Sequence, residues 1–155
     1  MLKFFNYDIV FQEIPDQITL AINITNCPNH CEGCHSSYLE RDFGEPLTRD
    51  SLSLLLDSET GITCVCFMGG DNNKKQIEEL ATFVKDTYPK IQVGWYSGQY
   101  EIPENVQYFD YIKLGPYIKE RGPLTDRNTN QRMYHVLRDD SDLILKDITN
   151  VFWRN

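Results

Sequence analysis

The chain has 155 residues and a formal net charge of −8, with 15 Lys and Arg against 23 Asp and Glu. This length suits a single domain over residues 1–155 with a real hydrophobic core, and 41% apolar residues exclude a disordered tail. An acidic chain without a dense basic run is a poor binder of nucleic acid or of an anionic membrane, so we expect neither partner.

The sequence also predicts the cellular compartment. No stretch approaches the roughly 20 apolar residues of a membrane span. Residues Met1 to Asp8 meet polar side chains too early for the apolar region of a signal peptide. Five cysteines, three of them crowded together, indicate metal binding rather than a disulfide framework. We therefore expect a protein of the reducing cytoplasm.

The first elements in chain order are strands. Residues Phe4 to Ile14 predict an opening strand or hairpin. From Ile18 to Ile24 apolar residues recur at every second position, which is the period of a strand, and this run ends at Asn26. A loop with three cysteines follows at once. Thr48 then has the character of an N-cap for a short helix with leucines on one face.

Strands and helices alternate through the middle of the chain. Apolar runs predict strands over Ile62–Met68, Ile91–Tyr96 and Tyr108–Leu114. Asn73 is placed to cap a helix that stops near Pro89. This alternation predicts an α/β fold of mostly parallel strands with right-handed crossovers.

The last third of the chain is less regular. The segment from Gly115 to Gln131, rich in Gly, Pro and Asn, predicts a long functional loop, and Met133–Leu137 and Leu143–Ile148 predict two more strands. A closed eight-stranded βα barrel needs about 250 residues. We therefore expect a partial barrel with an open side, which a protein substrate could close.

Four segments at strand ends are expected to meet. In parallel α/β sheets, ligands bind beyond the carboxyl ends of the strands. Here those ends are Cys27–Cys34, Gly69–Asp71, Ser97–Gly98 and Lys113–Gly115. The sequence therefore predicts one site at this edge of the sheet.

The spacing Cys27-x3-Cys31-x2-Cys34 carries the chemistry of that site. Iron–sulfur clusters are ordinarily held by four Cys thiolates. Three close ligands without a fourth in the loop indicate a [4Fe–4S] cluster with one iron open for chemistry. The alternative is a structural zinc site completed by His30 or His35.

Three other residues of interest receive a structural interpretation. Cys64 and Cys66 lie two apart in a predicted strand, and buried free cysteine behaves as a small hydrophobe, so we expect them to pack in the core. His135 lies in an apolar strand pattern, which is typical of a structural histidine.

With the CxxxCxxC loop placed after a core strand, the chain resembles the radical S-adenosylmethionine (SAM) superfamily. Within that superfamily it is similar to the anaerobic ribonucleoside-triphosphate reductase activating proteins, the activases of class III ribonucleotide reductase. The resemblance covers roughly residues 15 to 135. The segments that carry it, in order after the cysteine loop, are Phe67–Asp71, Trp95–Gly98, Lys113–Tyr117, Gly122–Leu124 and Asn130–Arg132.

The resemblance implies an activity and its cofactors. Cys27, Cys31 and Cys34 would hold three irons of one [4Fe–4S] cluster, and SAM would chelate the fourth. Reductive cleavage of SAM would give a 5′-deoxyadenosyl radical, which takes a hydrogen atom from a glycine of the large subunit of the anaerobic reductase. Reduced flavodoxin is the kind of single-electron donor that this chemistry needs.

The resemblance also assigns SAM contacts. Gly69, Gly70 and Asp71 would line the methionine end of SAM, and the backbone at Gly33, Cys34 and His35 would lie near the adenine. Ser97 is a candidate hydrogen-bonding residue, and Lys113 is a candidate partner for the carboxylate or ribose. Two alternatives stay open. One is a radical SAM enzyme that acts on another glycyl-radical enzyme or on a small molecule, and the other is a non-catalytic zinc-binding interaction module.

Overall fold

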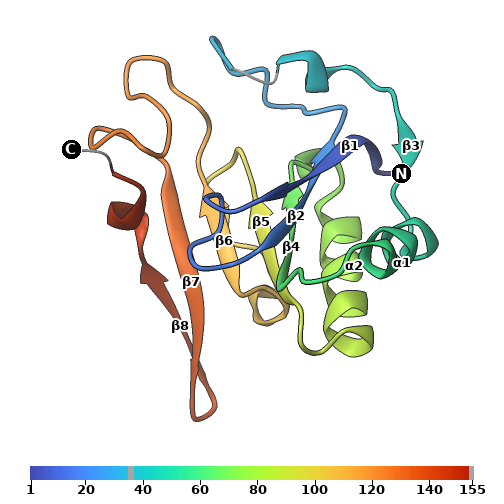
Figure 1. The fold of residues 1–155 in the computed structure, drawn as a ribbon. Helices are drawn as coiled ribbons and strands as arrows, with labels where there is room; N and C mark the ends of the chain where they lie inside the picture. Colours follow the sequence, from blue (N-terminus) through green and yellow to red (C-terminus); the bar gives the residue numbers. More distant parts are fainter. Residues whose placement is uncertain (35–36, 154–155) are drawn as a thin grey trace.

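A computed structural model describes residues 1–34 and 37–153 of the chain. Its strands form one sheet of eight in the order β3-β1-β2-β4-β5-β6-β7-β8 (Figure 1). In the described residues the strands are β1 (Lys3–Val10), β2 (Thr19–Ile24), β3 (Glu45–Pro46), β4 (Cys64–Met68), β5 (Gln92–Tyr96), β6 (Tyr111–Leu114), β7 (Arg132–Asp139) and β8 (Asp142–Asp147). The helices there are α1 (Arg49–Ser58), α2 (Lys74–Thr87) and the short 3-10 helices η1 (Ser37–Glu40), η2 (Asp71–Asn73), η3 (Val106–Tyr108) and η4 (Thr149–Phe152).

The sheet is parallel only at its centre. β2, β4, β5 and β6 pair in parallel, while the pairings of β1 with β2 and β3, of β6 with β7 and of β7 with β8 are antiparallel. A mixed α/β fold is therefore confirmed, but the expectation of mostly parallel strands is wrong. Parallel neighbours need a long crossover, whereas antiparallel neighbours can be joined by connections of any length, from the tight turn between β7 and β8 to the long loop between β6 and β7.

The two predicted N-cap residues begin the two α-helices, as expected from the sequence. Thr48 caps α1 in a capping box, since its hydroxyl accepts from the Ser51 N–H at 3.1 Å and the Ser51 hydroxyl accepts from the Thr48 N–H at 2.8 Å. Asn73 caps α2 by accepting from the Gln76 N–H at 3.2 Å. The first strand ends at Val10 rather than continuing to Ile14, and β3 and the 3-10 helices were not predicted.

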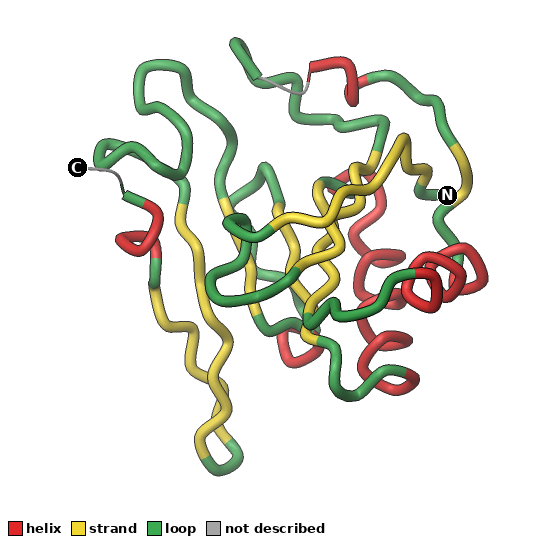
Figure 2. Tube along the Cα trace, viewed as in Figure 1, coloured by secondary structure: helices red, strands yellow, loops and turns green. Residues whose placement is uncertain are grey.

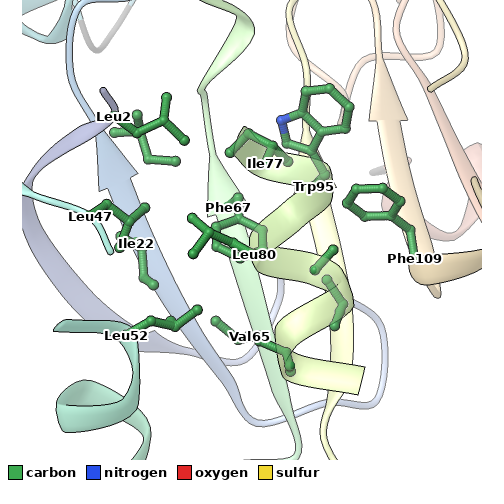
Figure 3. Packing of buried hydrophobic residues seen from close by; sticks show 14 of the residues in the cluster. Leu2, Ile22, Leu47, Leu52, Val65, Phe67, Ile77, Leu80, Trp95 and Phe109 are labelled. Atoms are coloured by element: carbon green, nitrogen blue, oxygen red, sulfur yellow. The ribbon is translucent and has the colours of Figure 1, made fainter. Parts of the chain in front are cut away.

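Side chains of the parallel strands alternate between two apolar layers. On one face, α1 and α2 cover the larger core, where Ile77 and Leu80 of α2 lie against Phe67 and Trp95 (Figure 3). The opposite face carries a smaller buried cluster of Ile14, Cys64, Cys66, Tyr111, Leu124 and Met133. The sheet is therefore buried on both faces at its centre, as parallel strands require. In the described part of the chain, no helix combines the length and the apolar character needed to cross a membrane.

A buried carboxylate ties the helix layer to the far half of the sheet. Asp110, 8% exposed, contacts the Lys85 ammonium of α2 and accepts a hydrogen bond from the Val93 N–H at 2.8 Å. Arg138 of β7 lies 3.3 Å from its other oxygen. One side chain therefore connects α2, β5 and β7.

We expect Asp110→Ala to destabilise the protein by about 3 kcal/mol, because the buried Val93 N–H loses its acceptor and the partly buried Lys85 ammonium loses its counter-charge. Chemical denaturation of the metal-free protein measures this loss. Asp57→Ala is the matched control: exposed Asp57 accepts from the Tyr88 hydroxyl at 2.9 Å, and its loss should cost about 1 kcal/mol or less. Equal losses in the two variants would contradict the bridging role of Asp110.

Candidate metal and ligand site

The cysteine loop leaves β2 and is held against the segment that follows it. The Asn26 N–H donates to the Arg41 carbonyl at 2.8 Å, and the Cys27 N–H donates to the Leu39 carbonyl at 3.0 Å. The imidazole of His30 pairs with the Glu40 carboxylate at 3.0 Å between Nδ1 and Oε2. His30 is thus paired with a carboxylate of the segment that follows the loop. His35, expected near a bound adenine, lies outside the described residues.

The four predicted strand ends meet around one cavity of about 510 Å³. It lies beyond the carboxyl ends of the parallel strands, where Figure 2 shows the loops after β2 and β6 rising from the same end of the sheet. Its lining includes all three loop cysteines together with Asn29, Leu39, Met68, Gly69, Asp71, Tyr96, Gly98, Lys113, Tyr117, Leu124 and Gln131. The long loop after β6 therefore forms part of the wall.

The three loop cysteines are reduced and half-buried, and they line this cavity. Burial raises the pKa of the Cys27 thiol, and hydrogen bonds from Asn29 oppose that rise. Within residues 1–34 and 37–153, no group of three or more His, Cys, Asp and Glu side chains is arranged to hold a metal ion. The structure thus brings the thiols to one wall, and their convergence on a metal centre stays a prediction.

Asp71 connects the cysteine loop with the end of β5. Its Oδ1 accepts from the Ser97 hydroxyl at 2.6 Å, and its Oδ2 accepts from the Gly98 N–H at 2.8 Å. The same Oδ2 accepts from the side-chain amide of Asn29 at 2.7 Å. The Ser97 hydroxyl in turn accepts from the Gln99 N–H at 3.1 Å. Two of the predicted SAM contacts, Asp71 and Ser97, are therefore hydrogen-bonded to each other.

The two glycines after β4 have positive φ angles, which residues with a side chain rarely adopt. Gly69 and Gly70 have φ of 114° and 98°, and a Cβ on Gly70 would lie 2.5 Å from Ile77 Cδ1. The Gly69 N–H donates to the Tyr96 carbonyl at 3.1 Å, and its carbonyl accepts from the Trp95 indole at 2.8 Å. Two bonds to β5 thus fix this turn beside the cavity.

Lys113 places a buried cation at the base of the cavity. It is 8% exposed, its ammonium donates to the Gly115 carbonyl at 3.1 Å, and it lies 5.6 Å from the centre of the Tyr96 ring. Burial lowers the pKa of this amine from 10.5 to about 8, while the negative charges of Asp71 and the three loop cysteines oppose that shift. An anionic group in the cavity would meet this side chain.

Of the other residues singled out in the sequence, Gly33 lies near the cavity, and Cys64, Cys66 and His135 have structural roles. Gly33 has φ of 75°, and a Cβ there would lie 3.4 Å from the Tyr117 ring, so this end of the cysteine loop approaches the loop after β6. Cys64 and Cys66 are fully buried below the cavity, as the packing interpretation predicts, and burial raises the pKa of Cys64 to about 12. His135 stacks on the Tyr111 ring with centroids 4.4 Å apart.

Sequence reasoning missed the side chains that join these segments. Asn29, inside the cysteine motif, donates to Asp71, and its amide oxygen accepts from Gln99 Nε2 at 3.1 Å. Tyr117 and Leu124 line the cavity from the loop after β6. That loop was predicted to be functional, but its composition did not identify which residues face the cavity.

Comparison with protein-family models, with curated proteins and with solved structures yields no match for this chain.

The depressed pKa of Lys113 predicts how stability depends on pH. Because the unfolded chain holds this proton more tightly, the unfolded state binds more protons between pH 8 and 10.5, and stability rises with pH there. Burying the charge costs on the order of 3 kcal/mol at pH 7. Lys113→Met removes that cost and also a hydrogen bond worth about 1 kcal/mol.

We therefore expect metal-free Lys113→Met protein to be more stable than wild type by about 2 kcal/mol at pH 7, with the advantage lost above pH 10. Denaturant unfolding across this pH range measures the difference. Exposed Lys119 supplies the control, since Lys119→Met should leave the pH profile unchanged. A Lys113→Met variant that is less stable than wild type at pH 7 would contradict a charged, desolvated amine.

Proposed function

We propose that this chain is a radical SAM activase that generates the glycyl radical of an anaerobic ribonucleoside-triphosphate reductase. The observation that carries the proposal is the meeting of the cysteine loop, Gly69–Asp71, Ser97–Gly98 and Lys113 around one cavity. The cysteine motif is only moderately specific by itself. Its position at the carboxyl ends of parallel strands, among the other segments of the resemblance, makes the assignment more specific.

The donor set fits the proposed cofactors. Cys27, Cys31 and Cys34 would hold a [4Fe–4S] cluster, in which different thiolates bond different irons and need not meet at one point as ligands of a single ion must. When bound and reduced, this group would supply the electron that cleaves SAM to methionine and the hydrogen-abstracting 5′-deoxyadenosyl radical. Lys113 would face the SAM carboxylate or ribose from below.

The side chains around the cavity would bind and orient SAM and would shield the reactive species from water. Leu39, Met68 and Leu124 give the cavity apolar walls, which limit the access of water to a reactive species. Both backbone polar groups of Gly69 are already bonded to β5, and Gly70 is buried outside the cavity lining, with its carbonyl accepting from the Asn73 N–H at 3.0 Å. We therefore expect the contacts of SAM with this turn to come mainly from Asp71. Asp71 accepts three hydrogen bonds, two of them at Oδ2, so a contact with the ammonium group of SAM would use the remaining acceptor capacity at Oδ1.

We infer that β2, β4, β5 and β6 with their connections form the core of an open βα barrel of the radical SAM type. The antiparallel β1 and β7 flank this core, so its wall is not continued by further parallel strands in the described residues. The reductase subunit would then complete the enclosure around its own glycine. A cytoplasmic location and reduced flavodoxin as the electron donor remain predictions.

Mixing experiments test the activity. The reconstituted protein, SAM, a reductant and the anaerobic reductase should together give a glycine-centred radical signal in electron paramagnetic resonance, and omission of SAM should abolish it. SAM cleavage without that signal would favour the alternative of another radical SAM enzyme. One tightly bound zinc without labile sulfide would favour the zinc-binding module.

Cys31→Ala should lose cluster binding and SAM cleavage while the core stays folded, because this thiol faces the cavity and lies outside both apolar clusters. Iron and sulfide analysis after anaerobic reconstitution measures the loss, and circular dichroism verifies the fold. Cys64→Ala is the matched control: it removes a buried thiol of the core and should keep a full cluster content at somewhat lower stability. Full SAM turnover by Cys31→Ala would overturn the ligand assignment.

A further inference from the structure

Asn29 lies between two hydrogen-bond acceptors, the Asp71 carboxylate and the Cys27 sulfur. Its Nδ2 lies 2.7 Å from Asp71 Oδ2 and 3.5 Å from Cys27 Sγ. A side-chain amide has two N–H donors on this nitrogen, so each acceptor can take one. Because an ionised carboxylate only accepts, the amide nitrogen and not the oxygen must face Asp71. The orientation of Asn29 therefore follows from its partners.

Two neighbours in the loop after β5 hold Asn29 in this position. Gln99 Nε2 donates to the Asn29 amide oxygen at 3.1 Å, which fixes the other side of the amide. Gly98 leaves room for it, since a Cβ at Gly98 would lie 2.5 Å from Asn29 Nδ2. The end of β5 thus determines where a donor to the Cys27 sulfur lies, although the two segments are far apart in sequence.

We propose that Asn29 is a positioning residue that donates a hydrogen bond to the Cys27 thiolate and so raises the reduction potential of the iron–sulfur centre. Hydrogen bonds with Asp71 and Gln99 keep Asn29 in this position, and the missing side chain at Gly98 leaves room for its amide. This inference rests on the proposed function, because it requires a cluster on Cys27. Hydrogen bonds to the sulfurs are among the factors that set cluster potentials. A reduced cluster carries one more negative charge, so an N–H donor stabilises it more than the oxidised form.

The same contacts couple the ligand cavity to the cluster loop. Asp71 is both the partner that orients Asn29 and a predicted contact of SAM. A ligand that engages Asp71 therefore acts on the residue that holds the donor to the Cys27 sulfur.

Redox titration of the reconstituted protein, followed by electron paramagnetic resonance, tests this role without measuring turnover. Asn29→Ala should favour the oxidised cluster about fivefold, which is a downward shift of about 40 mV at 59 mV per tenfold change for one electron. Gly98→Ala keeps the cysteine loop sequence intact and displaces Asn29, so it should lower the potential in the same direction. Asn72→Ala is the control, since exposed Asn72 adjoins Asp71 and should leave the potential unchanged.

The outcomes separate this inference from the proposed function. The first case is that wild type takes up a cluster, but Asn29→Ala and Gly98→Ala, at equal iron content, have the same potential as the control Asn72→Ala. The role of Asn29 is then overturned, and the proposed function stands. If wild type takes up no cluster, both fail. A drop in both variants supports the inference, and a drop in Asn29→Ala alone overturns the part assigned to Gly98.

Discussion

The parallel pairing of β2, β4, β5 and β6 determines where each segment of the candidate site lies. It brings four strand ends, distant in sequence, to one edge of the sheet, where they surround a single cavity. Asp71 then fastens this edge by bonding to Ser97, Gly98 and Asn29 at once. Without the pairing, the cysteine loop would have no fixed relation to the glycine turn or to Lys113.

The site carries features that oppose stability and suit a ligand. A desolvated ammonium at Lys113 and a thiol at Cys27 are both costly to charge in the metal-free protein. Such groups are typical of functional sites, where stability is given up for binding. Coordination to iron would stabilise the Cys27 thiolate, and an anionic cluster or a ligand carboxylate would stabilise the Lys113 ammonium.

Much of this arrangement could be predicted from the sequence, and the failures have physical causes. Strand periodicity and the caps Thr48 and Asn73 depend on local residues, so they located the helices and the core strands. The antiparallel flanks depend on the direction in which β1, β7 and β8 pair with their neighbours, which apolar periodicity does not encode. The partners of Asp71 and the role of Asn29 depend on loop conformation across long sequence separations, and the sequence gives no signal for them beyond the motif itself.

We propose that Cys27, Cys31 and Cys34 hold a four-iron cluster whose fourth iron binds SAM. Electron paramagnetic resonance of the anaerobically reconstituted and reduced protein, recorded with and without SAM, detects this binding at the open iron. We expect a reduced-cluster signal that changes on addition of SAM. A signal that SAM leaves unaltered, or protein that stays colourless after iron and sulfide are supplied, would contradict it.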